Sequence, residues 1–336
     1  MRDVLSIALR KMERLRWWNF LKFNLLKPLF IKFAGWDENK GFYVLDEDWN
    51  YLIILDACRY DVFAREIVNW DIDGELKRRI SRGSNTPEFL LENFVYRVLP
   101  FSIDTIMSDD PIYDDIIYIT ANPYVNYYLS GLFHEIVPVW LHGWNDQFKT
   151  VLPETVYEYT LRYVRKYGDR KRYIIHFMQP HEPYVPLLKE FKGLPITGFS
   201  CAVKEVLMKR VNQIPDRCLL DLVQEGKFSK DVAFKGYVEN LRFAIPYVEK
   251  LCKLLNGKIV VTSDHGEAFG EYIHPIVPYK VWGHPKGYRT KELIEVPWFV
   301  VNGRDKLNMR AVERELIRIK ARKLTPTKNR GNTDDN

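Results

Sequence analysis

The segment YLIILDACRYD, at residues 51–61, joins a short apolar run to a polar end. The five residues from Tyr51 to Leu55 are all apolar, and the chain becomes polar at Asp56. Continuous apolar runs of this length are typical of parallel strands that are covered on both faces. A carboxylate at the end of such a strand is costly to bury unless it caps a helix, is paired or binds a metal. Asp56 is therefore a candidate ligand that needs partners.

Three further apolar runs end in polar residues in the same way. They are residues 116–119 before Thr120, residues 173–175 before His176, and residues 259–261 before Thr262-Ser-Asp264-His265. Helical stretches lie between these runs, and alternating strands and helices predict a doubly wound, mostly parallel sheet flanked by helices. Ligands bind such sheets at the carboxyl ends of the strands, where these polar residues fall.

The segments outside the predicted strands are expected to form helices, a cap and terminal extensions. Residues 235–255 have apolar residues near helical spacing, and Pro246 predicts a kink in that helix. Residues 186–230 have weaker periodicity and predict an insertion or cap over the carboxyl edge of the sheet. The predicted units are a basic aromatic helical extension at 1–40, a catalytic domain at 41–304, a helix at 305–324 and a disordered tail at 325–336.

Composition narrows the class of protein. The chain has 336 residues, of which 46% are hydrophobic and 14% aromatic, so it can bury the core of one large α/β domain. Its net charge of +6 comes from basic residues interleaved with 44 acidic ones, which does not indicate nucleic acid as a partner. Four cysteines without CxxC spacing predict an intracellular, reduced, cytoplasmic protein.

The basic aromatic segment at residues 10–33 has two readings. Its charges interrupt every apolar run well before the roughly 20 residues that a membrane span needs, so we expect no crossing. Trp, Phe and Leu alternating with Lys and Arg suit an interfacial helix, which would make the protein peripheral at a membrane. The same pattern also suits a helix packed on the domain.

Candidate ligands gather at the predicted strand ends. Asp264 and His265 lie side by side before Gly266, and oxygen and imidazole ligands together suit zinc, manganese or iron better than magnesium alone. Further imidazoles are supplied by the segments HFMQPHEPY (176–184) and GHPKG (283–287), which contain His176, His181 and His284. Several such groups at one edge of a sheet predict a site.

The segment RGSNTPEF, at residues 82–89, predicts the start of a helix. Thr86 before Pro87 has the form of an N-cap followed by proline at the first helical position. A hydroxyl at a helix N-terminus also suits phosphate chemistry, because free N–H groups and the positive end of the helix dipole hold phosphate oxygens beside a nucleophile.

The order of these motifs resembles the alkaline phosphatase superfamily, in its sulfatase-like branch that includes phosphoethanolamine and glycerol-phosphate transferases. The motifs, in order, are ILDACRYD (54–61), RGSNTPEF (82–89), HFMQPHEPY (176–184), SDHGEAFGE (263–271), GHPKG (283–287) and EVPWF (295–299). The resemblance spans Trp49 to Val301. It implies an alkaline phosphatase or sulfatase-like fold and a hydrolase or transferase of phosphate mono- or diesters.

The resemblance also implies roles for individual residues. The implied ligands of the main metal are Asp56, Thr86, Asp264 and His265, and those of a second metal or of the substrate phosphate are His181 and His284. The candidate donors to substrate are Arg59, Arg82, Asn122, His176 and Lys286. The implied cofactor is one or two divalent ions, zinc or manganese, with calcium or magnesium as alternatives.

Thr86 is the implied nucleophile. It lies three residues after Gly83, as the threonine does in the phosphoethanolamine transferases, and we prefer it to Ser84 for that reason. Its oxygen would attack phosphorus, and the phosphothreonine intermediate would pass to water or to an alcohol.

Two departures from the family pattern matter. Type I sulfatases use a modified cysteine, and the stretch SNTPEF (84–89) has none, so sulfate hydrolysis by that chemistry is not expected. The spacing His176-x4-His181 also differs from the Asp-x-x-x-His of alkaline phosphatases, so the site could hold either one metal ion or two.

The alternative functions are a transferase at a membrane surface, a non-catalytic metal- or glycan-binding protein, and a phosphomutase-like isomerase, for which the 186–230 segment is short.

Overall fold

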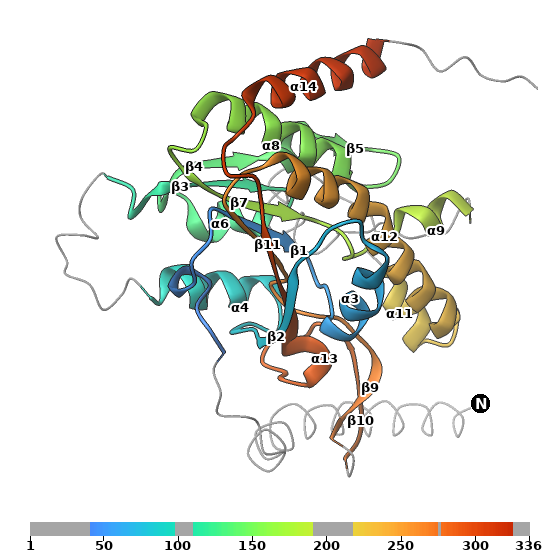
Figure 1. The fold of residues 1–336 in the computed structure, drawn as a ribbon. Helices are drawn as coiled ribbons and strands as arrows, with labels where there is room; N and C mark the ends of the chain where they lie inside the picture. Colours follow the sequence, from blue (N-terminus) through green and yellow to red (C-terminus); the bar gives the residue numbers. More distant parts are fainter. Residues whose placement is uncertain (1–40, 98–109, 191–217, 275–276, 325–336) are drawn as a thin grey trace, which may run out of the picture.

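The structure, a computed structural model, describes residues 41–97, 110–190, 218–274 and 277–324 (Figure 1). Several predicted segments lie outside these ranges. They are the extension at 1–40 with its 10–33 segment, the tail at 325–336, and residues 191–217 of the predicted cap.

A seven-stranded sheet forms the centre of the protein, in the order β2-β11-β8-β1-β7-β3-β4 (Figure 1). The strands are β1 (Tyr51–Leu55), β2 (Glu75–Ile80), β3 (Tyr113–Thr120), β4 (Phe133–Pro138), β7 (Arg172–Phe177), β8 (Lys258–Thr262) and β11 (Glu295–Asn302). The four predicted runs are β1, β3, β7 and β8, and each pairs in parallel with its neighbours among them. Only β11 runs antiparallel to its neighbours β8 and β2, so the prediction of a mostly parallel sheet is confirmed.

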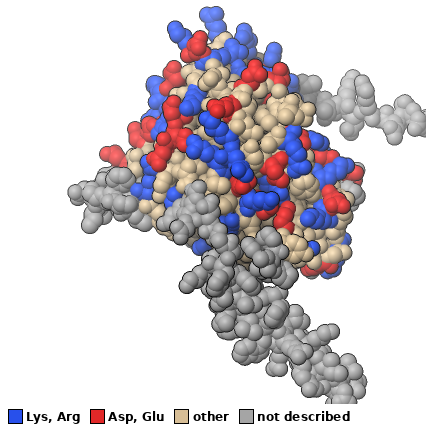
Figure 2. Space-filling view, turned by 60° about the horizontal axis from the view of Figure 1, so that its bottom comes forward, with Lys and Arg blue, Asp and Glu red and all other residues tan. Residues whose placement is uncertain are grey.

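Smaller elements surround the sheet. They are the hairpins β5 (Trp144–Asn145) with β6 (Thr150–Val151) and β9 (Ala268–His274) with β10 (Val277–Gly283), and the short helices α7 (Val139–His142), α9 (Val185–Glu190), α11 (Leu219–Gln224) and α13 (Lys291–Ile294). Acidic and basic side chains intermingle on the face shown in Figure 2.

Within the described ranges, no helix has the length and apolar character that crossing a membrane requires.

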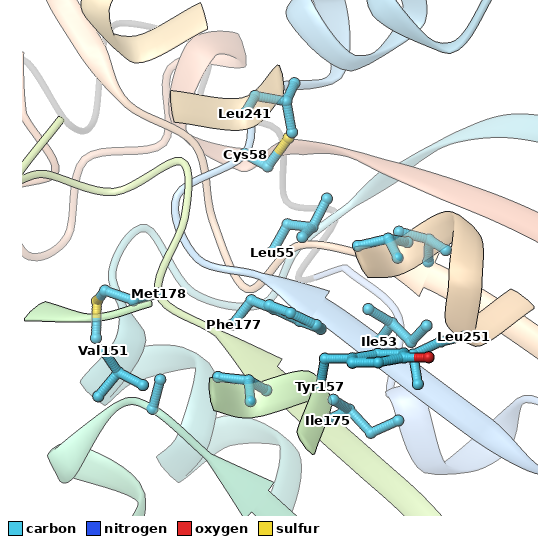
Figure 3. Packing of buried hydrophobic residues seen from close by; sticks show 14 of the residues in the cluster. Ile53, Leu55, Cys58, Val151, Tyr157, Ile175, Phe177, Met178, Leu241 and Leu251 are labelled. Carbon is cyan, nitrogen blue, oxygen red and sulfur yellow. The ribbon is translucent and has the colours of Figure 1, made fainter. Parts of the chain in front are cut away.

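Helices pack on both faces of the sheet because successive strand residues point to opposite sides. They are α3 (Tyr60–Glu66), α8 (Pro153–Tyr167), α12 (Lys230–Leu254) and α14 (Met309–Leu324) on one face, and α4 (Thr86–Leu90) and α6 (Pro123–Leu129) on the other. Ile53 and its parallel partner Ile175 face Tyr157 of α8 and Leu251 of α12 (Figure 3). Ile54 instead belongs to the cluster that contains residues of α4 and α6.

The longest helix, α12, carries the predicted apolar face. Leu241, Val248 and Leu251 on that face are fully buried. The helix begins five residues before the predicted start at Lys235, because the Ser229 hydroxyl accepts a hydrogen bond from the Val232 N–H group at 3.5 Å. Proline lies inside the helix without ending it, and the kink stays a prediction.

Candidate metal centre

The carboxyl ends of four adjacent strands bring the predicted polar residues together. Asp56 follows β1, His176 lies near the end of β7, and Asn122 follows β3. Asp264 and His265 follow β8 on the other side of β1. All five side chains are buried, with at most 3% of any residue exposed. The edge of the sheet at which the sequence predicts a site therefore holds a buried polar cluster.

Asp56, Asp264 and His265 can together hold a metal ion, since one ligand atom from each lies within 4.8 Å of the others. The Nδ1 atom of His265 donates to the Gly266 carbonyl at 2.8 Å, so the lone pair is on Nε2. That Nε2 lies 3.4 Å from Asp264 Oδ2 and 3.7 Å from Asp56 Oδ1. Asp56 Oδ1 is buried and has no hydrogen-bond partner among the described residues, as expected of an atom that binds an ion. The residues fit a divalent cation.

Thr86 directs its hydroxyl at this cluster. Its Oγ1 atom donates to Asp264 Oδ2 at 2.8 Å and lies 3.2 Å from His265 Nε2. The predicted helix cap is wrong by one residue, because Asn85 is the N-cap of α4 and its side chain accepts from the Glu88 N–H group at 2.9 Å. Since Asn85 caps the helix, the Thr86 hydroxyl is left for the cluster.

Asn122 and His176, predicted as donors to substrate, also lie at this cluster. The Asn122 amide donates to Asp56 Oδ2 at 2.7 Å and lies 3.4 Å from Thr86 Oγ1. His176 Nε2 lies 3.4 Å from Asp56 Oδ2, and its Nδ1 lies 3.1 Å from the Tyr118 hydroxyl. Both residues therefore surround the same Asp56 carboxylate.

Electrostatics keep Asp56 charged and His265 neutral. Burial raises the pKa of the Asp56 carboxyl, but the neighbouring imidazoles of His176, His181 and His265 outweigh burial and hold that pKa below its usual range. Burial lowers the pKa of His265 despite the nearby Asp264 carboxylate. A carboxylate beside a neutral imidazole is the state in which both groups bind metal.

The turn after β1 places Asp56 through contacts with α12. Ala57 has a left-handed backbone with φ of 60°, and its N–H group donates to Asp264 Oδ1 at 3.1 Å. The Tyr237 hydroxyl donates to the Ala57 carbonyl at 2.7 Å and accepts from the Arg59 N–H group at 2.9 Å. One hydroxyl therefore satisfies two buried backbone groups of the turn.

We expect Tyr237→Phe to destabilise the protein, because it leaves the buried Ala57 carbonyl and Arg59 N–H group unpaired. Each unsatisfied group costs about 1–3 kcal/mol. Equilibrium urea unfolding measures the loss. Tyr247→Phe is the control, since the Tyr247 hydroxyl bonds to the exposed Glu154 side chain; equal losses in the two variants would contradict the account.

A second group that can hold an ion consists of His181, Glu267 and His284, with one ligand atom from each within 4.8 Å of the others. Glu267 precedes β9 and His284 follows β10, and Ala268 pairs with Gly283 at the base of this hairpin. The hairpin therefore brings together two residues that are 17 positions apart in sequence. Sequence reasoning missed Glu267 as a ligand, although it is the fourth residue of the Asp-His-Gly-Glu motif.

The second cluster is charged and touches the first. The Glu267 carboxylate, 1% exposed, accepts from His284 Nδ1 at 3.0 Å. Burial lowers the pKa of His284, but the Glu267 carboxylate outweighs burial and raises the pKa to about 9. The His284 ring lies 4.6 Å from the His265 ring, centroid to centroid. Arg59 Nη1 donates to the Glu267 carbonyl at 3.2 Å and so supports this segment.

The predicted cationic donors have different surroundings. Arg59 pairs with Asp61 at 2.9 Å, and Arg82 pairs with Glu92 at 2.9 Å. Lys286, two residues after His284, is exposed. Two of these three cations therefore balance carboxylates of the protein itself.

The fold and the two clusters define a doubly wound α/β protein with two groups of side chains at the carboxyl edge of its sheet that could each hold a metal ion. No family model matches the sequence, and no curated protein matches it. Similar solved structures do exist. The soluble domain of lipooligosaccharide phosphoethanolamine transferase A from Neisseria meningitidis is similar over 79% of this chain and 81% of that chain, with 11% identity and a TM-score of 0.47.

Two further structures show comparable similarity. The C-terminal periplasmic domain of EptC from Escherichia coli, in complex with zinc, is similar over 81% of this chain and 77% of that chain, with 13% identity and a TM-score of 0.46. Lipoteichoic acid synthase LtaP from Listeria monocytogenes is similar over 83% of this chain and 71% of that chain, with 13% identity and a TM-score of 0.42. At these identities and TM-scores, the roles of individual residues rest on contacts within the chain itself.

Proposed function

We propose that the protein is a metal-dependent enzyme that hydrolyses or transfers phosphate-type esters, with Thr86 as its nucleophile. The observation that carries the proposal is the position of the Thr86 hydroxyl, within hydrogen-bonding distance of both Asp264 and His265. A protein that only binds metal has no need of a hydroxyl at that place, whereas a nucleophile must lie beside its activating groups.

The proposed reaction has two displacements. Asp56, Asp264 and His265 would hold a divalent ion, which would lower the pKa of the Thr86 hydroxyl and stabilise developing negative charge. Thr86 Oγ1 forms a bond to phosphorus as the bond to the leaving oxygen breaks, and the hydroxyl proton passes to solvent. The leaving oxygen takes a proton from solvent. Water or an alcohol then attacks the phosphothreonine and loses its proton to solvent. The bond between phosphorus and Thr86 Oγ1 breaks, and Oγ1 takes a proton from solvent, which restores the hydroxyl.

Asn122 has a positioning role in this scheme. Its side-chain oxygen accepts from the Tyr124 N–H group at 2.9 Å, which fixes the orientation of the amide. The amide nitrogen therefore points to Asp56 and towards the Thr86 oxygen. We propose that it holds the nucleophile in line and stabilises charge on the substrate oxygens.

For the second cluster, we propose a second metal ion bound by His181, Glu267 and His284. The alternative is that His181 and His284 grip the substrate phosphate directly. Glu267 favours the ion, because a buried carboxylate repels a phosphate and attracts a cation. Which divalent metals occupy the two clusters is a matter for measurement, with zinc or manganese expected from the mixed oxygen and imidazole ligands.

We expect phosphodiesters to be better substrates than phosphomonoesters. A monoester carries a second negative charge that needs a further cation, and Arg59 and Arg82 are already paired with carboxylates. The measurement compares kcat/KM for bis-p-nitrophenyl phosphate and p-nitrophenyl phosphate with added zinc or manganese. A preference for the monoester would contradict this reading, and Lys286→Ala would then show whether the exposed lysine supplies the missing charge.

Elemental analysis of the purified protein, combined with the same assays, tests the proposed function. Metal-dependent cleavage of either phosphate substrate supports it, and p-nitrophenyl sulfate should remain intact because the site has a threonine in place of the modified cysteine. Bound metal without turnover would favour a transferase that requires its own acceptor. A protein without bound metal would overturn the proposal.

The cellular setting of the enzyme remains a proposal. The cysteine pattern favours the cytoplasm, and residues 10–33 favour peripheral contact with a membrane, where a transferase would meet lipid-linked substrates. Sedimentation of the full chain with anionic vesicles, compared with a chain in which the aromatic residues of 10–33 are replaced by serine, tests the membrane contact.

A further inference from the structure

The loop that carries His181 depends on other parts of the chain for its hydrogen bonds. The loop has the sequence Gln179-Pro-His-Glu-Pro183, and its two prolines have no N–H group to donate. Pro180, Glu182 and Pro183 are nevertheless buried or nearly so, and buried carbonyl groups require donors. The loop therefore presents more acceptors than its own backbone can satisfy.

Asn240, from the middle of α12, supplies those donors. Its amide nitrogen lies 3.1 Å from the Pro180 carbonyl oxygen, 2.9 Å from that of His181 and 3.3 Å from that of Pro183. Its side-chain oxygen accepts from the Val185 N–H group at 3.1 Å. The side chain is fully buried, so water does not compete for these contacts.

These contacts fix His181 from two sides. Its carbonyl accepts from Asn240, and its N–H group donates to the carbonyl of Asp56 at 3.1 Å. Its Nδ1 atom donates to the Glu182 carbonyl at 2.6 Å, so the lone pair of the imidazole is on Nε2. Hydrogen bonds therefore join the backbone of His181 both to α12 and to Asp56 of the first cluster.

We propose that Asn240 is a positioning residue for the second metal cluster, because it sets the loop on which His181 reaches Glu267 and His284. The inference rests on the proposed function, in which a second ion binds to His181, Glu267 and His284. Asn240 touches neither the ion nor the substrate and acts only through His181. Residues of this kind, one step removed from the ligands, change metal affinity by about 10- to 100-fold when they are replaced.

The test is calorimetric titration of the full chain, stripped of metal, with zinc alone. Asn240→Asp is the first variant, since it keeps the shape and the acceptor for Val185 but loses the donors to the three carbonyls. We expect two ions in the wild type, and in the variant an affinity for the second ion that is about 10- to 100-fold weaker. Affinity for the first ion should stay at the wild-type value, and His181→Ala should show the same selective loss.

Two further variants separate positioning from general damage. Asn240→Ser removes the amide without adding charge, and it replaces Asn240→Asp if that variant does not fold. Val248→Ala is the matched control, because Val248 is buried on the same helix, about two turns away from Asn240. Val248→Ala should lower stability and leave both zinc affinities unchanged.

The outcomes distinguish this inference from the proposed function. Two ions bound equally well by wild type and by the Asn240 variants would overturn the positioning role and leave the enzyme proposal standing. A single ion in the wild type would also overturn it, because there would be no second site to position. Two ions with selective loss in the variants, but no hydrolysis of any phosphate ester, would support the inference, count against a hydrolase and favour a transferase that requires its own acceptor.

Discussion

Thr86→Ala should lower kcat for a phosphate ester by about a thousandfold or more, because it removes the oxygen that we propose forms the covalent intermediate. Asp56, Asp264 and His265 remain in this variant, so it should still bind metal. The measurement is steady-state hydrolysis of bis-p-nitrophenyl phosphate at saturating metal, with metal content determined on the same samples. In the wild type, rapid quenching followed by mass spectrometry should find the phosphoryl group on the peptide that contains Thr86.

Ser84→Ala is the matched control for this experiment. Ser84 lies two residues earlier, and its hydroxyl donates to Glu88 Oε2 at 2.7 Å rather than to the metal cluster. We expect Ser84→Ala to retain most of the activity and Thr86→Ser to retain part of it, since serine keeps the attacking oxygen. An inactive Ser84→Ala variant beside an active Thr86→Ala variant would contradict the proposal and make Ser84 the nucleophile instead of Thr86.

Asp264→Asn should remove the stabilisation that an ion in the first cluster gives to the folded protein. Asp264 accepts hydrogen bonds from the N–H groups of Ala57 and His265 and from the hydroxyl of Thr86, so one carboxylate joins the turn, the backbone of His265 and the proposed nucleophile. An ion that binds only the folded state stabilises it by about 4 kcal/mol at a thousand times its Kd. We expect zinc to raise the Tm of the wild type, and to raise that of the variant much less.

Differential scanning fluorimetry at increasing zinc concentration measures this effect. Asp71→Asn is the control, since the side chain of Asp71 is 91% exposed and pairs with Lys253 at the surface. Its metal-dependent rise in Tm should equal that of the wild type. If Asp264→Asn responds to zinc as fully as the control does, the ion binds elsewhere and the first cluster is not its site.

The sheet and the first cluster were predictable because the sequence patterns that indicate them are local. Each central strand is a short apolar run, and the residue that leaves the strand is polar, as at Asp56 and Asp264. Adjacent parallel strands end at the same edge, so the meeting of these residues follows from the fold class alone. The antiparallel direction of β11 has no such signal, because the residues of a strand do not record which way its neighbour runs.

The features that were missed depend on contacts between distant segments. Asn85 and Thr86 are both good helix caps, and the structure shows that Asn85 is the cap, because its side chain accepts from the Glu88 N–H group. Glu267 meets His284 only because a hairpin forms between them. Asn240 looks like an ordinary polar residue on a helix until the proline-containing loop packs against it. Such contacts become visible only with coordinates.

The hairpin of β9 and β10 has a consequence for how the protein can vary. Glu267 and His284 are set by the pairing at the hairpin base, where Ala268 lies opposite Gly283, and not by the number of residues beyond it. Insertions or deletions towards the turn should therefore leave the second cluster intact as long as the base stays in register.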